Sequence, residues 1–345
     1  MHGLLLGLAS AILFGASTPA SKWLLGSLEP LQLAGLLYLG AAAGMVPVVA
    51  SDRESTVGLR LDPANAARLC GAVVFGGILG PVLLLAALRL TLAGSVSLLL
   101  TLEMAATAVL GVVLFHEHLG RTGWLGVGGV IAAGTLVAWG SGLPGLVAGL
   151  LTAAACLCWG LDNHLTALID GITPARSTLV KGVFAGATNL GLGLTSGPLA
   201  ATPGQIVAAL AVGALSYGAS IALYIRSAHE LGATRAQSVF ACAPFAGAAM
   251  AVAFLGEPIQ SLQVTAAILL VPSVAMLLLS QHAHAHVHEA IEHIHSHRHD
   301  DSHHLHDHPG QPRSLRHSHS HRHDRLEHAH PHWPDIHHRH PHTEQ

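Results

Sequence analysis

The chain of 345 residues is 51% hydrophobic and only 10% charged, and its formal net charge is -3 at pH 7. So few charges cannot solvate a soluble domain, in which about a quarter of the residues are charged. This composition argues against a soluble enzyme, and the charge gives no reason to expect a nucleic-acid partner. The four cysteines lie in apolar runs without a CxxC pair, which argues against a secreted disulfide scaffold.

The composition changes sharply near residue 282. Residues 1–281 hold 10 Lys/Arg and 10 Asp/Glu, whereas residues 282–345 hold 6 and 9, together with 23 of the 28 histidines. The first part is typical of a polytopic membrane protein. The second is too polar to bury a core, and we expect it to be a disordered tail.

A membrane-spanning helix needs about 20 mainly apolar residues to cross about 30 Å of hydrocarbon. Ten segments meet this requirement, and the first lacks the basic start of a signal peptide. Pro, Gly or charged residues separate them. The predicted all-α fold therefore has spans at 3–22, 31–50, 68–89, 93–115, 123–140, 144–162, 175–197, 204–226, 233–255 and 262–281.

The distribution of Lys and Arg predicts the orientation, because cytoplasmic loops carry an excess of these residues. With the N-terminus inside, only Lys22 and Arg89 lie outside. We therefore expect both termini on the cytoplasmic face of the cell (inner) membrane. The residues assigned to the inner face are Arg53, Arg60, Arg68, Arg121, Arg176, Lys181, Arg226 and Arg235.

An internal repeat relates residues 90–119 to residues 230–259 at an offset of 140. Each block forms the fourth span of a five-span half and ends in a glutamate, Glu117 or Glu257. Because five is odd, the two halves must have opposite orientations, as in secondary transporters with a substrate site near the midplane. The expected units are a five-helix repeat at 1–141, a second at 142–281 and the tail at 282–345.

These features resemble the EamA group of ten-span carriers in the drug/metabolite transporter superfamily. The resemblance rests on the block at 90–119, its second copy at 230–259 and the W-G-x-x-N pattern at Trp159–Asn163, and it covers residues 3–281. It implies a secondary transporter that needs no cofactor and is not an enzyme. Members are associated with export of amino acids, metabolites, drugs and metal-chelating compounds, so the resemblance leaves the substrate open.

Glu103 lies about ten residues into the fourth span, near the middle of the bilayer. An ionisable residue at that depth is a functional candidate by default. We expect Glu103 to couple transport to protons; the alternative is a structural carboxyl that hydrogen-bonds a neighbouring helix. The repeat places Ala243 and Pro244 opposite Glu103 and Met104, so only one half supplies this charge.

Asp162 and Asn163 end the sixth span, and Lys181 enters the seventh at a matching depth. An Asp162–Lys181 ion pair would neutralise both charges. Such a pair would be either a gate that breaks during alternating access or a static link between two helices.

Neutral polar residues in the second half are further candidates for a substrate path. Ser216, Ser220 and Tyr224 recur at i, i+4 and i+8 and would share one helix face. Hydrogen bonds between helices would give the same pattern. Asn189, Tyr217 and Gln237 complete this set, and Pro19, Pro81, Pro244 and Pro272 are candidate kinks or breaks in the spans.

Alternating histidines in the tail indicate transition-metal binding. Neutral imidazole is a ligand for zinc, nickel, cobalt and copper, and no fixed spacing selects one of them. The alternative is a solubilising or pH-responsive extension. The candidate ligands are His282, His284, His286, His288, His293, His295, His297, His299, His304, His306, His308, His317, His319, His321, His323, His328, His330 and His332.

Three functions are compatible with this sequence. The first is a proton-coupled exporter of a small polar metabolite or metal-chelating compound, with a tail that binds cytosolic metal. The second is a nickel, cobalt or zinc efflux transporter whose tail loads the cargo. The third is a membrane-anchored metal buffer or sensor, for which ten spans are excessive. The expected partners are the lipid bilayer, a small-molecule substrate and metal ions; a homodimer is compatible with the sequence.

Overall fold

The structure is a computed structural model that describes residues 2–51, 63–115, 118–169 and 172–279, and four backbone segments of the tail. Arg53, Arg60, His116 and Glu117 lie outside the described residues, as do the side chains of the tail. The helices are α1 (His2–Gly15), α2 (Ser17–Leu24), α3 (Pro30–Ser51), α4 (Pro63–Ala72), η1 (Val73–Leu79), α5 (Gly80–Leu90), α6 (Ala93–Leu99), α7 (Leu102–Phe115), α8 (Arg121–Gly140), α9 (Gly142–Ala167), α10 (Pro174–Ser196), α11 (Pro203–Val212), η2 (Gly213–Ala219), α12 (Ser220–Leu231), α13 (Ala233–Phe240), α14 (Ala243–Leu255) and α15 (Ser261–Leu279).

Within the described residues, nine segments are long and apolar enough to cross a membrane, several of them formed by two or three consecutive helices. Helix α10, with 23 residues, is long enough for a tenth crossing but is less apolar than the nine, since it carries Arg176, Lys181 and Asn189. The predicted all-α fold of a polytopic membrane protein is confirmed.

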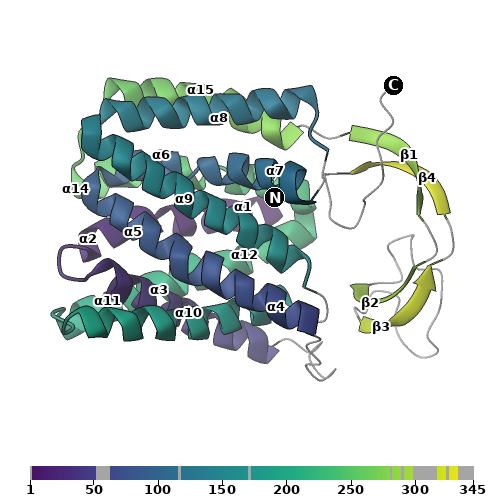
Figure 1. The fold of residues 1–345 in the computed structure, drawn as a ribbon, viewed down its shortest axis with the longest axis horizontal. Coiled ribbons are helices and arrows are strands. Elements are labelled where there is room, and N and C mark those ends of the chain that lie inside the picture. Colours follow the sequence, from purple (N-terminus) through teal and green to yellow (C-terminus); the bar gives the residue numbers. More distant parts are fainter. Residues whose placement is uncertain are drawn as a thin grey trace.

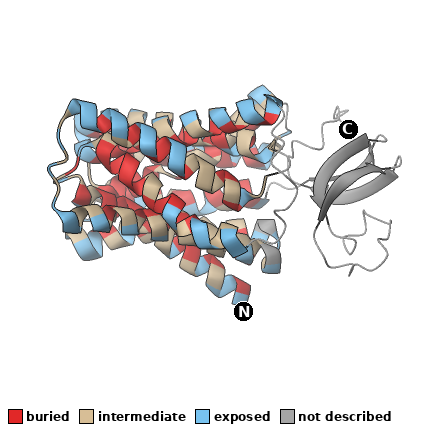
Figure 2. Cartoon of the chain, turned by 90° about the horizontal axis from the view of Figure 1, so that it is seen from below, coloured by how far each residue is buried: buried red, intermediate tan, exposed pale blue. Residues whose placement is uncertain are grey.

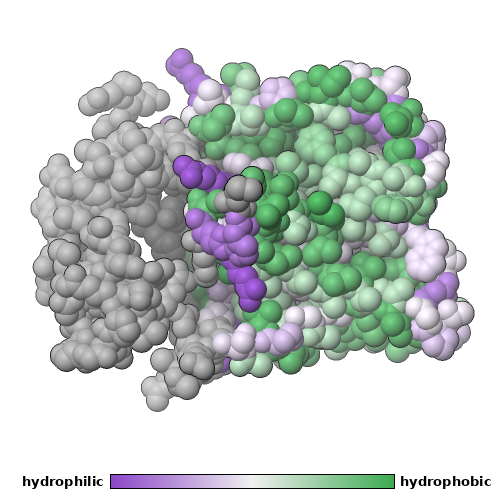
Figure 3. Space-filling view, turned by 180° about the vertical axis from the view of Figure 1, so that it is seen from behind, coloured by the Kyte–Doolittle hydropathy of each residue, from purple (hydrophilic) through white to green (hydrophobic). Residues whose placement is uncertain are grey.

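The spans run roughly side by side in one bundle (Figure 1). Helices α8 and α15 pack against each other along one edge, and α3 and α10 pack together near the opposite edge. Buried residues fill the interior, while exposed ones lie on the outside and at the ends (Figure 2). Figure 3 shows apolar side chains over most of one face, with hydrophilic ones gathered near its ends. This distribution suits a surface that contacts lipid.

Two apolar clusters form the core. The first surrounds Leu33, Leu37 and Leu85, which are at most 2% exposed. The second joins α8 to α15 through Val130 and Leu270, again at most 1% exposed. Glycines allow close approach of the helices elsewhere, because a Cβ at Gly40 or Gly213 would overlap the facing backbone.

The internal repeat is visible in the secondary structure. The π-helices η1 at 73–79 and η2 at 213–219 lie 140 residues apart, as do the first residues of α8 and α15. The fourth span is interrupted at Leu100–Thr101 and the ninth at Ala241–Cys242. The distance between these two breaks in the sequence is nearly the same as that between the two π-helices. Equivalent distortions at equivalent places mark two copies of one five-helix unit.

Contacts at the helix ends show that the two copies are inverted. Lys22, at the end of the first span, donates hydrogen bonds to Leu88 O and Thr91 O at the end of the third span. Arg68, near the start of the third span, donates to Leu168 O just beyond the end of the sixth, at 2.7 Å. The first span therefore runs parallel to the third and antiparallel to the sixth, which opens the second copy.

The tail differs from the expectation of disorder in four short segments. Strand β1 (His282–His288) pairs antiparallel with β4 (Leu326–His332), and β2 (Ile291–His297) pairs with β3 (His317–His323). Alternation of histidine with other residues has the period of two that a strand requires, which accounts for strands in these segments.

Candidate functional site

The two interrupted spans meet at a cavity. Its walls come from both repeats, and its interior holds about 80 Å³ of space that the centre of a water molecule can reach. Helices that break inside the bilayer are tolerated where the backbone lines such a cavity. The lining residues are Phe14, Gly15, Thr18, Ser97, Leu100, Thr101, Glu103, Met104, Gln237, Phe240, Ala241, Ala243 and Pro244.

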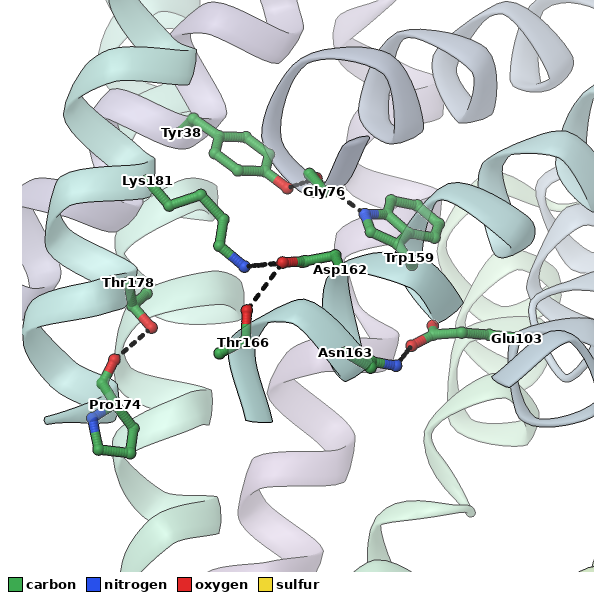
Figure 4. A network of polar contacts seen from close by, with 10 residues as sticks. All are labelled: Tyr38, Gly76, Glu103, Trp159, Asp162, Asn163, Thr166, Pro174, Thr178 and Lys181. Atoms are coloured by element: carbon green, nitrogen blue, oxygen red, sulfur yellow. Dashed lines mark hydrogen bonds and ion pairs between the residues drawn. The ribbon is translucent and has the colours of Figure 1, made fainter. Parts of the chain in front are cut away.

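Glu103 lies in the wall of this cavity, in the first turn of α7. Asn163 of α9 donates a hydrogen bond to Glu103 Oε1 at 3.1 Å and another to Thr107 Oγ1 at 3.3 Å. Two residues predicted separately are thus brought together across α7 and α9 (Figure 4).

Asp162 and Lys181 form the ion pair that the sequence predicts. Lys181 Nζ lies 2.7 Å from both carboxylate oxygens, and Thr166 donates a third hydrogen bond at 2.9 Å. The two side chains are only 9% and 16% exposed. Gly76 of η1 makes room for the pair, since a Cβ there would overlap the Asp162 carboxylate. Adjacent residues of α9 therefore bind α10 on one side and α7 on the other (Figure 4).

Three further side chains, those of Tyr38, Trp159 and Asn189, donate hydrogen bonds to carbonyl oxygens of the π-helix η1. Gly80 N–H donates to Phe75 O, five residues back, so Gly76 O is left without its usual partner. Tyr38 and Trp159 both donate to Gly76 O, at 2.6 and 2.9 Å (Figure 4).

Pro81 frees the next carbonyl of η1, because it has no N–H to donate to Gly77 O. Asn189, which is fully buried, supplies that hydrogen bond at 3.0 Å. The Asn189 Oδ1 atom has no hydrogen-bond partner among the described residues. Asn189, which was predicted for the substrate path, thus holds a free carbonyl of η1.

The sequence analysis did not single out Tyr38. The only sequence feature that could have drawn attention to it is that the chain has just three tyrosines.

The polar residues predicted on the eighth span separate into different environments. Ser216 lies inside η2, where π-helical spacing replaces the α-helical i, i+4 spacing behind the expected common face. Ser220 contacts α1, because Ser10 Oγ donates to its carbonyl oxygen at 2.7 Å. Tyr224 donates to Gln237 Oε1 at 2.8 Å. Of this second-half set, Gln237 lines the cavity.

At the end of the bundle near Lys22, Glu257 joins the repeats. Its carboxylate accepts hydrogen bonds from the backbone N–H groups of Ala93 and Gly94, at 2.7 and 2.8 Å. The second repeat thereby caps the N-terminus of α6 in the first. At the same end, Arg89 pairs with Glu29 at 2.8 Å, and this hydrogen bond lowers the pKa of the exposed Glu29 carboxyl.

An inverted pair of five-helix repeats around a cavity between interrupted helices defines the molecule as a transporter-type membrane protein. The chain belongs to the EamA-like transporter family, which matches residues 1–139 and again residues 146–279. An uncharacterized transporter of Methanothermobacter thermautotrophicus (strain Delta H) is 24% identical over 293 residues, covering 78% of this chain and 84% of the relative. One solved crystal structure is similar in fold, with a TM-score of 0.58 and 17% identity over 81% of this chain and 96% of that one.

Proposed function

We propose that the protein is a proton-coupled secondary exporter of a small polar metabolite or metal-chelating compound. The observation that carries this proposal is the cavity formed jointly by the interrupted spans of the two repeats, with Glu103 in its wall. In inverted-repeat carriers, such a position gives one substrate site alternate access to the two faces.

Glu103 is the group through which protons would couple to this movement. It is the carboxylate of the cavity wall, and its Asn163 contact ties it to α9. Loss or gain of the proton changes whether the Asn163 amide donates to a charged or a neutral oxygen, which alters the strength of that contact. The coupling therefore requires no cofactor.

The Asp162–Lys181 pair has two possible roles in this mechanism. As a gate it would break when α9 and α10 separate; as a static link it would hold them together throughout the cycle. The pair lies between helices of the second repeat and against η1 of the first, which is compatible with both roles.

We further propose that the termini face the cytoplasm of the cell membrane and that the tail binds a transition metal there. The positively charged residues of the sequence support this orientation. In the tail, the backbone register places histidine opposite histidine at three positions in each strand pair, such as His284 opposite His330 and His295 opposite His319.

Metal is proposed as a regulator of export rather than as its cargo. Within the described residues, no group of three or more His, Cys, Asp or Glu side chains is placed to hold a metal ion. A metal efflux transporter would need such groups along its path through the membrane.

The test compares cells that express the full chain, residues 1–281 or Glu103→Gln during nickel, cobalt, zinc or copper stress. Growth and cell-associated metal are measured by elemental mass spectrometry. We expect unchanged metal content in all strains. Metal content lowered by the full chain, but not by 1–281 or Glu103→Gln, would contradict a regulatory role and identify metal or a metal complex as cargo.

A further inference from the structure

The first turn of α6 is bound by side chains of the second repeat. Glu257, which follows α14, accepts hydrogen bonds from the N–H groups of Ala93 and Gly94. The next residue, Ser95, accepts a hydrogen bond at 2.8 Å from Gln263 Nε2 in the first turn of α15. Three successive residues of the fourth span are thus bound by the segment that joins the ninth span to the tenth.

The charges at this place match the two helices that meet there. Lys22 donates hydrogen bonds to Leu88 O and Thr91 O, where α5 ends, and Glu257 binds the N–H groups with which α6 begins. A cation at a helix C-terminus and an anion at an N-terminus are both favourable. The Lys22 ammonium and the Glu257 carboxylate also attract each other. The turn between α5 and α6 is therefore held by opposite charges from both repeats, at what we call the capped end of the bundle.

From the capped end inwards, α6 packs closely along α14. All seven residues of α6 are buried. A Cβ atom at Gly94 would lie 3.8 Å from both Ala248 O and Ala251 Cβ. A Cβ atom at Gly247 would approach Ser97 Oγ, in the cavity wall, to 2.8 Å. Small residues thus let two half-spans of opposite repeats meet without a gap, which closes this route between the cavity and the capped end.

The equivalent pair of helices is apart at the opposite end. At the offset of the repeat, α6 corresponds to α13 and α14 corresponds to α7. The described residues of α13 pack mainly on α12 and α1, however, and those of α7 mainly on α9 and α8. The cavity lies between these two helices, since its wall includes Glu103 and Met104 of α7 and Gln237 and Phe240 of α13. The two ends of one inverted repeat pair are therefore in different states.

We propose that Glu257 is the latch of a gate: with Gln263 it holds α6 on α14 and closes the capped end, and it releases α6 when the cavity opens there. The inference rests on the proposed function and deepens it by naming the residues that control access. Inverted repeats can exchange the arrangements of their two ends. The separation of α13 from α7 is thus the arrangement that α6 and α14 adopt once the latch is released. Glu257 is a positioning residue, which acts on the cavity through α6.

Access to the cavity can be measured without a substrate, as the rate at which a membrane-impermeant thiosulfonate modifies a cysteine in its wall. The reporters are Leu100→Cys and Met104→Cys, each in a full-length chain whose four native cysteines are replaced by alanine. The reagent is added to either face of membrane vesicles. Glu29→Cys marks the capped end, where this residue is exposed, and Arg121→Cys at the start of α8 marks the other.

With Glu257 in place, we expect Leu100→Cys to react from the face marked by Arg121→Cys and to be protected from the capped end. Glu257→Ala should speed its reaction from the capped end about 10- to 100-fold, the effect of losing hydrogen bonds to a charged group. Glu29→Ala removes another glutamate at the same end, which pairs with Arg89 of α5, and should leave the rate unchanged. Thermal melting confirms that each variant is folded.

A disulfide separates release of the latch from general loosening of the bundle. Gly94→Cys and Ala251→Cys bring two Cβ atoms 3.8 Å apart, a spacing that a disulfide can bridge. In a Glu257→Ala chain that carries this pair, oxidation should again protect Leu100→Cys from the capped end. Reduction should remove the protection.

Leu100→Cys that stays protected from the capped end in folded Glu257→Ala, or that reacts equally from both ends when Glu257 is present, overturns the latch. A disulfide that forms without restoring protection overturns α6 and α14 as the contact that opens. Labelling needs neither a substrate nor a proton gradient, so these results do not depend on the proposed function. A chain that shows the expected labelling but exports no metabolite would keep the latch and lose the proposed function.

Discussion

The ion pair with Lys181 is the main interaction that stabilises the Asp162 carboxylate, because both charged groups are largely buried. We expect Asp162→Asn to destabilise the protein by about 3–5 kcal/mol, since it leaves the Lys181 ammonium buried without a counter-charge. The double variant Asp162→Asn/Lys181→Met should recover most of that loss. Thermal unfolding in detergent measures both.

The same double variant separates the two roles of the ion pair. If it is stable but does not transport, the pair is a gate. If it is stable and transports normally, the pair is a static link. A double variant that is less stable than the single one would contradict our account of why Asp162 matters.

Gly76 permits the ion pair to approach η1. We expect Gly76→Ala to displace the Asp162 carboxylate and to lower the unfolding temperature, because a Cβ would overlap it. Gly128→Ala on α8 is the matched control: nothing lies within 4 Å of its added Cβ, and alanine favours a helix more than glycine. Equal melting temperatures for the two variants would argue against this packing role.

At the scale of elements, Glu257 connects the end of the ninth span to the start of the fourth. We expect Glu257→Ala to cost about 1–2 kcal/mol of stability, the value of a lost helix cap, because two N–H groups of α6 lose their acceptor. Glu29→Ala removes a solvent-exposed pair and should change stability little. Thermal melts of the two variants test this difference, which would vanish if solvent replaced the Glu257 carboxylate at no cost.

The sequence predicted the membrane spans and their repeat better than it predicted the breaks and π-helices within the spans. Length and hydropathy give the spans, and the offset of 140 gives the repeat. Pro244 signals the break in the ninth span because it lies in the first turn of α14, but no proline marks Leu100–Thr101. Pro81 follows η1, whereas Ser220 and Ile221 follow η2, so a residue pattern could indicate one π-helix and not the other. Tertiary contacts determine the remaining distortions.

At the candidate site, the sequence predicted the charged residues but not all of the hydrogen bonds that they make. Glu103, Asp162 and Lys181 stand out because charges are rare in spans, and matching depth suffices to pair the last two. The Glu103–Asn163 contact depends on how α7 and α9 pack, which no local pattern encodes. The i, i+4 spacing of Ser216 and Ser220 does not by itself place them on one face, because Ser216 lies in a π-helix.

For the whole molecule, the tail should give the protein a metal affinity that depends on pH. We expect the full-length chain to bind several nickel or zinc ions at about pH 7.5 and to release them near pH 5.5, because protonated imidazole cannot coordinate a metal. Calorimetry at both pH values measures this, with residues 1–281 as the control. Equal binding by the two chains would contradict the assignment of metal binding to the tail.

The two π-helices also carry information about ancestry. A π-helical turn accommodates one residue more than an α-helical turn, so each copy behaves as if a single residue had been inserted into its third span. The π-helical segment occupies 73–79 in one copy and 213–219 in the other, which is the same interval of 140 residues that separates the rest of the repeat. A single insertion in an ancestral five-span protein, followed by duplication and fusion of its gene, explains both with the fewest events. The distorted turn would then be older than the ten-span chain itself.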